Sequence, residues 1–256
     1  MSGTLYGLGV GPGDPELLTL KALRILKASP VVAYPAPDHG TSFARAIVAG
    51  FLTGDQDEIP IVVPMRVERF PATEVYDRAA EAIAARLDRD EDVAVLCEGD
   101  PFFYGSFMYL FERLAERHPV EIVPGVASPM ASAARALRPL AARNDVLTVI
   151  PGPLDDEALA AKLQGAEAFV IMKLGRHFDR VRLLIERLGF LDRAVYCERV
   201  TLAEERVLPL AAVSGAAPYF SMILGYRGNE PAIAGRYARD AARMPSFPSS
   251  NATDQA

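Results

Sequence analysis

Two glycine-rich segments of this sequence carry carboxylates where a nucleotide-binding loop would carry a base. Residues 7–14 place Asp14 after a run of alternating glycines, and residues 97–105 contain Glu98, Gly99 and Asp100. Glycine lets the backbone come close to a ligand, but a phosphate site also needs lysine or arginine. The two segments therefore disfavour a phosphate ligand. They allow a cationic, hydroxyl-rich ligand such as S-adenosylmethionine, which carries a sulfonium charge and a ribose.

The other chemistry-bearing residues form no recognisable catalytic or metal-binding pattern. His39 and His118 stand among polar residues and are expected at the surface, whereas His177 is expected to be structural. No pair has the spacing of metal ligands, so we predict no protein-bound metal. Ser128 has neither a Gly-x-Ser-x-Gly elbow nor an evident histidine partner, which disfavours a hydrolase.

The composition is typical of a globular, acidic protein. Half of the 256 residues are hydrophobic and the net charge is −6, which disfavours broad affinity for nucleic acid. The sequence shows neither an apolar run of the roughly 20 residues that a membrane helix needs nor a signal peptide. Cys97 and Cys197 are expected to be buried thiols in a reducing cytoplasm. We therefore expect a cytoplasmic protein.

The first half alternates strand-like and helix-like segments, as in a mainly parallel sheet covered by helices on both faces. Asp14 is expected to cap a helix that starts at Pro15 and continues to Lys27. The expected strands are 5–10, 31–34, 59–63, 93–97 and 120–123, and the other expected helices are 42–52, 73–87, 107–117 and 128–137. We assign residues 1–140 to this N-terminal α/β domain.

The pattern of alternating strands and helices is interrupted near residues 137–144, where a proline and a polar turn follow the last helix of the first half. A second α/β domain is predicted for residues 141–243. Its expected strands are 146–150, 168–172, 194–197 and 219–224, with helices at 156–163 and 178–188. Residues 244–256 are rich in proline and serine and are predicted to be a disordered tail.

The sequence resembles the tetrapyrrole methylases, which use S-adenosylmethionine in cobalamin and sirohaem synthesis. The resemblance covers about residues 3–228. Its general motifs are Gly9-Val10-Gly11-Pro12-Gly13-Asp14, Glu98-Gly99-Asp100-Pro101 and Val123-Pro124-Gly125-Val126. Further motifs resemble the branch that methylates C-20 of precorrin-2: Gly3-Thr4-Leu5-Tyr6-Gly7, residues 96–106, Arg143-Asn144-Asp145-Val146-Leu147, Ile171-Met172-Lys173-Leu174-Gly175-Arg176 and Pro218-Tyr219-Phe220-Ser221. Relatives that methylate uroporphyrinogen have a second glycine where Glu98 stands.

The resemblance implies two α/β domains with a cofactor cleft between them, in a homodimer. By position it assigns cofactor contacts to Pro12, Glu98, Gly99, Asp100, Phe103, Ala127, Ser128, Met172, Leu174, Val200, Thr201 and Ser221. It does not say which of Met172 and Leu174 faces the cofactor.

The implied substrate, precorrin-2, carries many carboxylates, so arginines are expected at its rim. We name Arg143, Arg176 and Arg199 as substrate-binding residues. Asp100 and Tyr104 are the residues expected to help remove the C-20 proton. Two alternatives stay open: the cobalt-dependent version of the step, acting on cobalt-factor II, and a non-catalytic tetrapyrrole-binding protein. Neither alternative involves nucleic acid or a membrane.

Overall fold

The computed structural model describes residues 2–63 and 70–237, and it divides the chain into two compact units. The first unit is Met1–Ala127 and the second begins at Ser128. The sequence analysis predicts this boundary near residue 140 instead, where a proline and a polar turn occur. The structure differs because helix α5 (Ser128–Ala136) packs against strands of the second sheet. The predicted tail 244–256 lies outside the described residues.

The first unit contains a five-stranded parallel sheet in the order β3-β2-β4-β1-β5. Its strands are β1 (Leu5–Gly9), β2 (Val31–Pro37), β3 (Asp57–Val63), β4 (Val93–Cys97) and β5 (Val120–Val123). All five residues of β4 are buried, because a parallel sheet is covered on both faces. The parallel sheet predicted for the first half is therefore confirmed.

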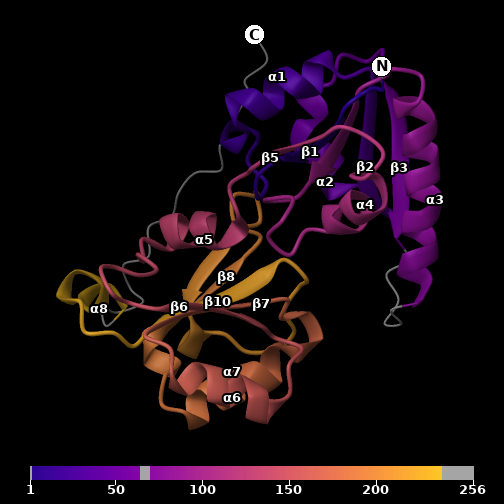
Figure 1. Ribbon diagram of the computed structural model, residues 1–256. Coiled ribbons are helices and arrows are strands. Elements are labelled where there is room, and N and C mark those ends of the chain that lie inside the picture. The colour runs from indigo at the N-terminus through magenta and orange to yellow at the C-terminus, as the bar shows by residue number, and fades with distance from the viewer. Residues whose placement is uncertain (1, 64–69, 238–256) are drawn as a thin grey trace. The chain divides into compact units, whose positions relative to one another are not determined.

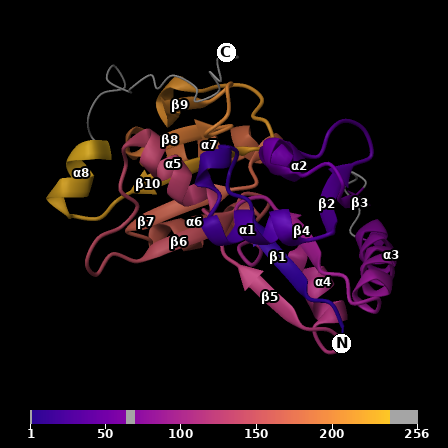
Figure 2. The same ribbon diagram turned by 90° about the horizontal axis from the view of Figure 1, so that it is seen from above.

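Helices cover both faces of this sheet. They are α1 (Leu20–Ala28), α2 (Phe43–Val48), α3 (Phe70–Leu87) and α4 (Phe107–Leu114), with short 3₁₀ turns at Pro15–Leu17 and Ala49–Phe51. One core cluster joins α1 and α2 to the sheet, and another joins α3 and α4 to it. Figure 2 shows the two pairs of helices on opposite sides.

The helix expected from Pro15 starts later than predicted. Asp14 accepts a hydrogen bond from the Glu16 N–H at 2.9 Å, so it caps only the 3₁₀ turn Pro15–Leu17. Thr19 caps α1 itself, because its hydroxyl accepts from the Ala22 N–H at 3.1 Å. Two capping residues in succession divide the predicted helix into two pieces.

The second unit contains a mixed five-stranded sheet in the order β6-β7-β10-β8-β9. Strands β6 and β7 are parallel, β10 is antiparallel to β7 and β8, and β9 is antiparallel to β8. The strands are β6 (Leu147–Pro151), β7 (Ala168–Met172), β8 (Ala194–Glu198), β9 (Arg206–Pro209) and β10 (Ser221–Tyr226). The sequence analysis missed β9, whose four residues are only partly buried or exposed.

Helices cover this sheet on both faces as well. They are α5, α6 (Asp156–Gln164), α7 (Phe178–Arg187) and α8 (Pro231–Tyr237), with 3₁₀ turns at Gly175–His177, Leu191–Arg193 and Leu210–Ala212. Helices α6 and α7 share a core cluster on one face, and Figure 1 shows α5 on the other. Within the described residues, no helix is both long and apolar enough to cross a membrane.

Candidate functional site

The two glycine-rich segments leave the first sheet at its topological switch point. Strands β1 and β4 are neighbours, with Gly9 opposite Cys97. The connection after β1 enters α1 on one face of the sheet, and the connection after β4 enters α4 on the other. In open α/β sheets, ligands bind outside the carboxyl ends of strands at such a point. The topology therefore supports a ligand site at the two segments singled out in the sequence.

Four glycines at this edge lie backbone against backbone: Gly9, Gly11, Gly99 and Gly125. Gly99 donates to the Gly11 carbonyl at 2.8 Å, and Gly11 donates back to Gly99 at 3.3 Å. A Cβ atom on Gly9 would lie 2.8 Å from the Gly99 carbonyl oxygen and would overlap the backbone of Gly125. Gly9, Gly99 and Gly125, which we call the glycine seam, thus allow the loops after β1, β4 and β5 to pack together. The sequence suggested close approach to a ligand, and the structure shows close approach to neighbouring loops.

Asp100 fastens the loop after β4. One carboxylate oxygen accepts from the Phe102 N–H at 2.9 Å, and the other accepts from the Gly125 N–H at 3.1 Å. The second bond ties the loop after β4 to the turn after β5. Both oxygens of Asp100 therefore have backbone donors, and the geometry gives this carboxylate a positioning task.

Glu98 is a half-buried acid at the end of β4. Burial raises the pKa of its carboxyl, and backbone N–H groups of Glu98 and Ala44 act in the opposite direction. Burial, together with the charges of Glu98 and Asp100, also raises the pKa of the Cys97 thiol. Added positive charge at this edge would relieve the cost of these neighbouring acids, and the site thus fits a cationic ligand better than an anionic one.

Aromatic rings extend the same edge. Phe102 is exposed, yet its ring meets Phe111 edge-on at 5.3 Å. Phe103 is half-buried and meets exposed Tyr104 at 5.2 Å, also edge-on. Tyr104 has a φ of 57°, a left-handed conformation that non-glycine residues rarely adopt. Pro12, in the loop after β1, is half-buried.

The cofactor-binding residues predicted between positions 172 and 221 lie at one edge of the second sheet. Because β10 is antiparallel to β7 and β8, its amino end lies beside their carboxyl ends. Ser221, the first residue of β10, is opposite Glu198, and Met222 is opposite Met172. Val200 and Thr201 follow β8 directly. This edge therefore holds Met172, Leu174, Val200, Thr201 and Ser221.

Met172 and Leu174 have different surroundings at that edge. Leu174 is completely buried in the core cluster beneath α6 and α7, whereas Met172 lies outside this cluster and is 9% exposed. The side chain of Leu174 thus serves packing, and Met172 is the better placed of the two for a ligand. Ala127 and Ser128, which end the first unit and begin α5, are both half-buried.

Comparison with known proteins identifies the family. The sequence matches the model of the tetrapyrrole (corrin/porphyrin) methylases over residues 4–213. The chain belongs to the tetrapyrrole methylase family. Its fold, two sheets each covered by helices, agrees with this assignment, because the solved structures that it resembles include a member of the family.

Named relatives of this tetrapyrrole methylase include two C-20 enzymes. A Sinorhizobium protein named precorrin-2 C(20)-methyltransferase is 42% identical over 231 residues, or 87% of this chain and 94% of that protein. A Salmonella typhimurium protein named cobalt-precorrin-2 C(20)-methyltransferase is 34% identical over 88% of this chain and 96% of the relative. The Thermus thermophilus uroporphyrin-III C-methyltransferase, solved with S-adenyl homocysteine, aligns with a TM-score of 0.64 at 27% identity over 87% of this chain and 92% of that one.

The three arginines expected at the substrate rim of this tetrapyrrole methylase do not all lie together. Arg199 follows β8, and Arg176 follows β7 in the turn Gly175–His177, so both belong to the edge described above. Arg143 precedes β6 and pairs with Glu230 at 3.3 Å. Glu230 follows the carboxyl end of β10, so Arg143 lies at the opposite edge of the same sheet. The structure groups two of the three arginines.

The expectation for His118 is wrong. This histidine is buried at 6% exposure, and its Nδ1 lies 2.9 Å from the Ser2 hydroxyl. Its sequence neighbours Glu116 and Arg117 are exposed, whereas the histidine itself is not. His39 is exposed, as expected, and His177 is half-buried. Within residues 2–63 and 70–237, no group of three or more His, Cys, Asp and Glu side chains could hold a metal ion.

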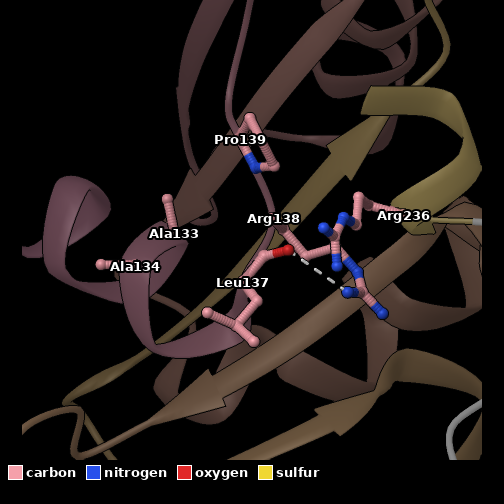
Figure 3. A pocket seen from close by; sticks show the side chains of 6 residues that line it. All are labelled: Ala133, Ala134, Leu137, Arg138, Pro139 and Arg236. Carbon is pink, nitrogen blue, oxygen red and sulfur yellow. Dashed lines mark hydrogen bonds between the residues drawn. The ribbon is translucent and has the colours of Figure 1, made fainter. Parts of the chain in front are cut away.

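Figure 3 shows a pocket of about 390 Å³ in the second unit. It is lined by the last turn of α5, the residues after it, and α8: Ala133, Ala134, Leu137, Arg138, Pro139 and Arg236. None of the residues expected to bind cofactor or substrate lines it. This pocket therefore gives no support to the cofactor and substrate contacts expected from the sequence.

Sequence reasoning missed a group of charged residues beside the edge of the second sheet that holds Ser221. Glu198 is buried and accepts from the Tyr196 hydroxyl at 2.8 Å and from Arg206 at 3.0 Å. Glu205 forms an ion pair with Arg135 of α5. The Arg135–Glu205 partners are far apart in the sequence, and no motif links them, so only the fold reveals the contact.

Proposed function

We propose that this chain transfers a methyl group from S-adenosylmethionine to C-20 of precorrin-2, giving precorrin-3A, in cobalamin synthesis. The observation that carries the proposal is 42% identity to a precorrin-2 C(20)-methyltransferase along nearly the whole of both chains. The acidic edge of the first sheet supports it, because Glu98 and Asp100 suit a sulfonium better than a phosphate.

The cofactor would be held by residues at the two strand edges. In the first unit these are Pro12, Glu98, Gly99, Asp100, Phe103 and Ala127, and in the second Ser128, Met172, Leu174, Val200, Thr201 and Ser221. For Leu174, whose side chain is in the core, the backbone is the part left for a contact. When bound, S-adenosylmethionine supplies a methyl group already activated by its sulfonium.

The remaining task of the chain is alignment, exclusion of water and removal of a proton. Orientation of two reactants accounts for a large part of such a rate enhancement. Asp100 aligns the loop after β4 through Phe102 and Gly125. Between Asp100 and Tyr104, the exposed Tyr104 side chain is the better placed to assist loss of the C-20 proton, because Asp100 already accepts two N–H groups. Arg176 and Arg199 would bind substrate carboxylates.

The test is a transfer assay with methyl-labelled S-adenosylmethionine and precorrin-2, run with and without a chelator. We expect one label per tetrapyrrole, located at C-20 by NMR, and no effect of the chelator. Binding of precorrin-2 without transfer would instead indicate a carrier. Abolition of transfer by the chelator would contradict the absence of a protein-bound metal.

Sedimentation of the pure protein tests the proposed homodimer, and fractionation of cells tests the proposed cytoplasmic location.

A second candidate is the same methylation on a cobalt-loaded substrate. It is favoured by the 34% identity to a cobalt-precorrin-2 enzyme. Parallel assays with metal-free and cobalt-loaded precorrin-2 separate the two. We expect a higher kcat/KM for the metal-free substrate, and the reverse order would assign the chain to the cobalt-dependent step.

A further inference from the structure

The hairpin loop between β8 and β9 has a strained backbone. This loop, residues 199–205, contains Arg199 with a φ of 46° and Thr201 with a φ of 69°. Left-handed backbone is costly for residues with a Cβ, and most costly for β-branched ones such as threonine. Such a conformation persists only where surrounding contacts hold it, and it is found mostly at functional sites.

Glu205 holds the strained residue from within the loop. Its carboxylate accepts the Thr201 backbone N–H at 2.7 Å. The loop is closed further by the Leu202 N–H, which donates to the Arg199 carbonyl at 3.0 Å. At the base of the hairpin, Arg206 pairs across the strands with Glu198 at 3.0 Å. The side chain of Glu205 thus contacts the backbone of Thr201 directly.

Arg135 of α5 holds Glu205 in turn. The Arg135 Nε lies 2.8 and 2.9 Å from the two carboxylate oxygens, and one terminal guanidinium nitrogen lies 2.8 Å from the first of them. The side chains are 26% and 15% exposed, so water screens this pair only in part. Charge-assisted pairs with several short contacts fix geometry as well as energy. The chain of contacts therefore connects α5 to the backbone of Thr201.

We propose that Arg135 and Glu205 are positioning residues, which hold Thr201 in its left-handed conformation so that residues 200 and 201 meet the methyl donor. This inference rests on the proposed function, because the contact of Val200 and Thr201 with the donor is part of that proposal. Neither Arg135 nor Glu205 needs to touch the donor. Their effect is on the shape of the loop.

The first test is calorimetry with S-adenosylhomocysteine, the stable product of the donor. Glu205→Ala is expected to raise its Kd about tenfold, with kcat at saturating donor changed much less. Glu205→Gln keeps an oxygen for the Thr201 N–H and should raise the Kd by less. Glu186→Ala is the matched control, since it removes a glutamate that pairs with Arg182 within α7 at 3.3 Å. It should leave the Kd unchanged.

A double-mutant cycle separates positioning from general loss of structure. Glycine adopts the left-handed conformation without steric cost. In a Thr201→Gly background, Glu205→Ala should therefore raise the Kd less than threefold. An equal factor in both backgrounds would overturn the inference, since Glu205 would then not act through Thr201. If Glu205→Ala does not fold, Arg135→Lys replaces it in the cycle, and an unchanged Kd for that variant overturns the inference.

Failure of the proposed function and failure of the positioning role give different results. If the unmodified protein does not bind S-adenosylhomocysteine, the proposed function fails and this inference falls with it. If the unmodified protein binds and Glu205→Ala binds equally well, only the positioning role is refuted. Thermal melts of each variant show how much of any effect comes from unfolding.

Discussion

Asp100 and Gly125 are joined by a hydrogen bond of 3.1 Å from the glycine N–H to the aspartate carboxylate. The two residues follow different strands, β4 and β5, so this bond fixes the spacing of two loops at the switch point of the first sheet. The carboxylate is a part of the scaffold on which the proposed cofactor site depends.

Replacement of Asp100 should therefore weaken cofactor binding. Asp100→Ala removes the acceptor for two backbone N–H groups, and losing a hydrogen bond to a charged group costs about 1.5–3 kcal/mol. We expect the Kd of S-adenosylhomocysteine to rise roughly tenfold or more by calorimetry. Asp155→Ala is the comparison, because Asp155 caps α6 through the Ala158 N–H at 2.8 Å. It should lower stability by about 1 kcal/mol and leave the Kd unchanged. Equal dissociation constants for both variants would sink the assignment.

The glycine seam predicts a large stability effect from a single methyl group. A Cβ on Gly125 would overlap the Gly99 carbonyl oxygen, which is backbone and has little room to move. Gly125→Ala should lower the free energy of unfolding by about 2 kcal/mol or more in urea denaturation. Gly165→Ala is the control, since a Cβ added there would meet open space within 4 Å. It should change stability by no more than about 1 kcal/mol. A small effect at Gly125 would show that the loops can separate without cost.

Substrate binding should depend on the arginines of one sheet edge. Arg176→Ala and Arg199→Ala should each raise the KM for precorrin-2 roughly tenfold, because each removes a charge-assisted hydrogen bond to a substrate carboxylate. The Kd of S-adenosylhomocysteine should stay constant. Added salt should raise the KM of the unmodified protein, because exposed charges are screened beyond about 8–10 Å. Arg143→Ala, at the other edge of the sheet, should leave KM unchanged. If Arg143→Ala has the largest effect, the substrate rim lies at that other edge.

Glu58 should stabilise the first unit in a pH-dependent way. The Arg45 guanidinium, which donates two hydrogen bonds at 2.6 and 2.7 Å, lowers the pKa of Glu58 from 4.5 to about 2. The native-state pKa lies below the unfolded one, so the stabilisation is complete above pH 4.5 and disappears as the pH falls toward 2. Because both side chains are about one-third exposed, its size should not exceed about 1 kcal/mol.

The measurement is urea denaturation of the unmodified protein and of Glu58→Gln across this pH range. The difference between them should be constant near neutral pH and should shrink below pH 4.5. Glu74→Gln is the control, since Glu74 pairs with Arg78 in an open, exposed geometry at 3.5 Å. It should show no such trend. A Glu58 effect that grows in acid would reverse the sign of the linkage and refute the assignment.

Local sequence patterns were sufficient to predict the first sheet and its loops. Strand β4 is a continuous apolar run followed at once by Glu98, Gly99 and Asp100, so the strand and the acids at its end could be read together. The family motifs then predicted cofactor contacts at Met172 and Ser221, two residues that the structure brings to one edge of the second sheet.

Features that depend on packing between distant residues could not be predicted in this way. The contact of Arg135 with Glu205 crosses from α5 to a hairpin loop, and nothing in the sequence connects the two. His118 has polar neighbours, yet its ring is buried beside the Ser2 hydroxyl, 116 residues away in the sequence. Arg143 and Arg199 resemble each other as arginines at turns, and only the antiparallel direction of β10 shows that they lie at opposite edges.

The position of β10 also affects how the second unit can form during synthesis. This strand lies between β7 and β8, although it is translated after both. Domains fold as the growing chain leaves the ribosome, amino end first. One edge of β7 and one edge of β8 therefore stay without a hydrogen-bonded partner strand until residues 221–226 have emerged. In the first unit, by contrast, β1 is translated first and gains both of its neighbours by residue 123. A pause in translation between residues 198 and 221 would leave the first sheet complete and the second one open.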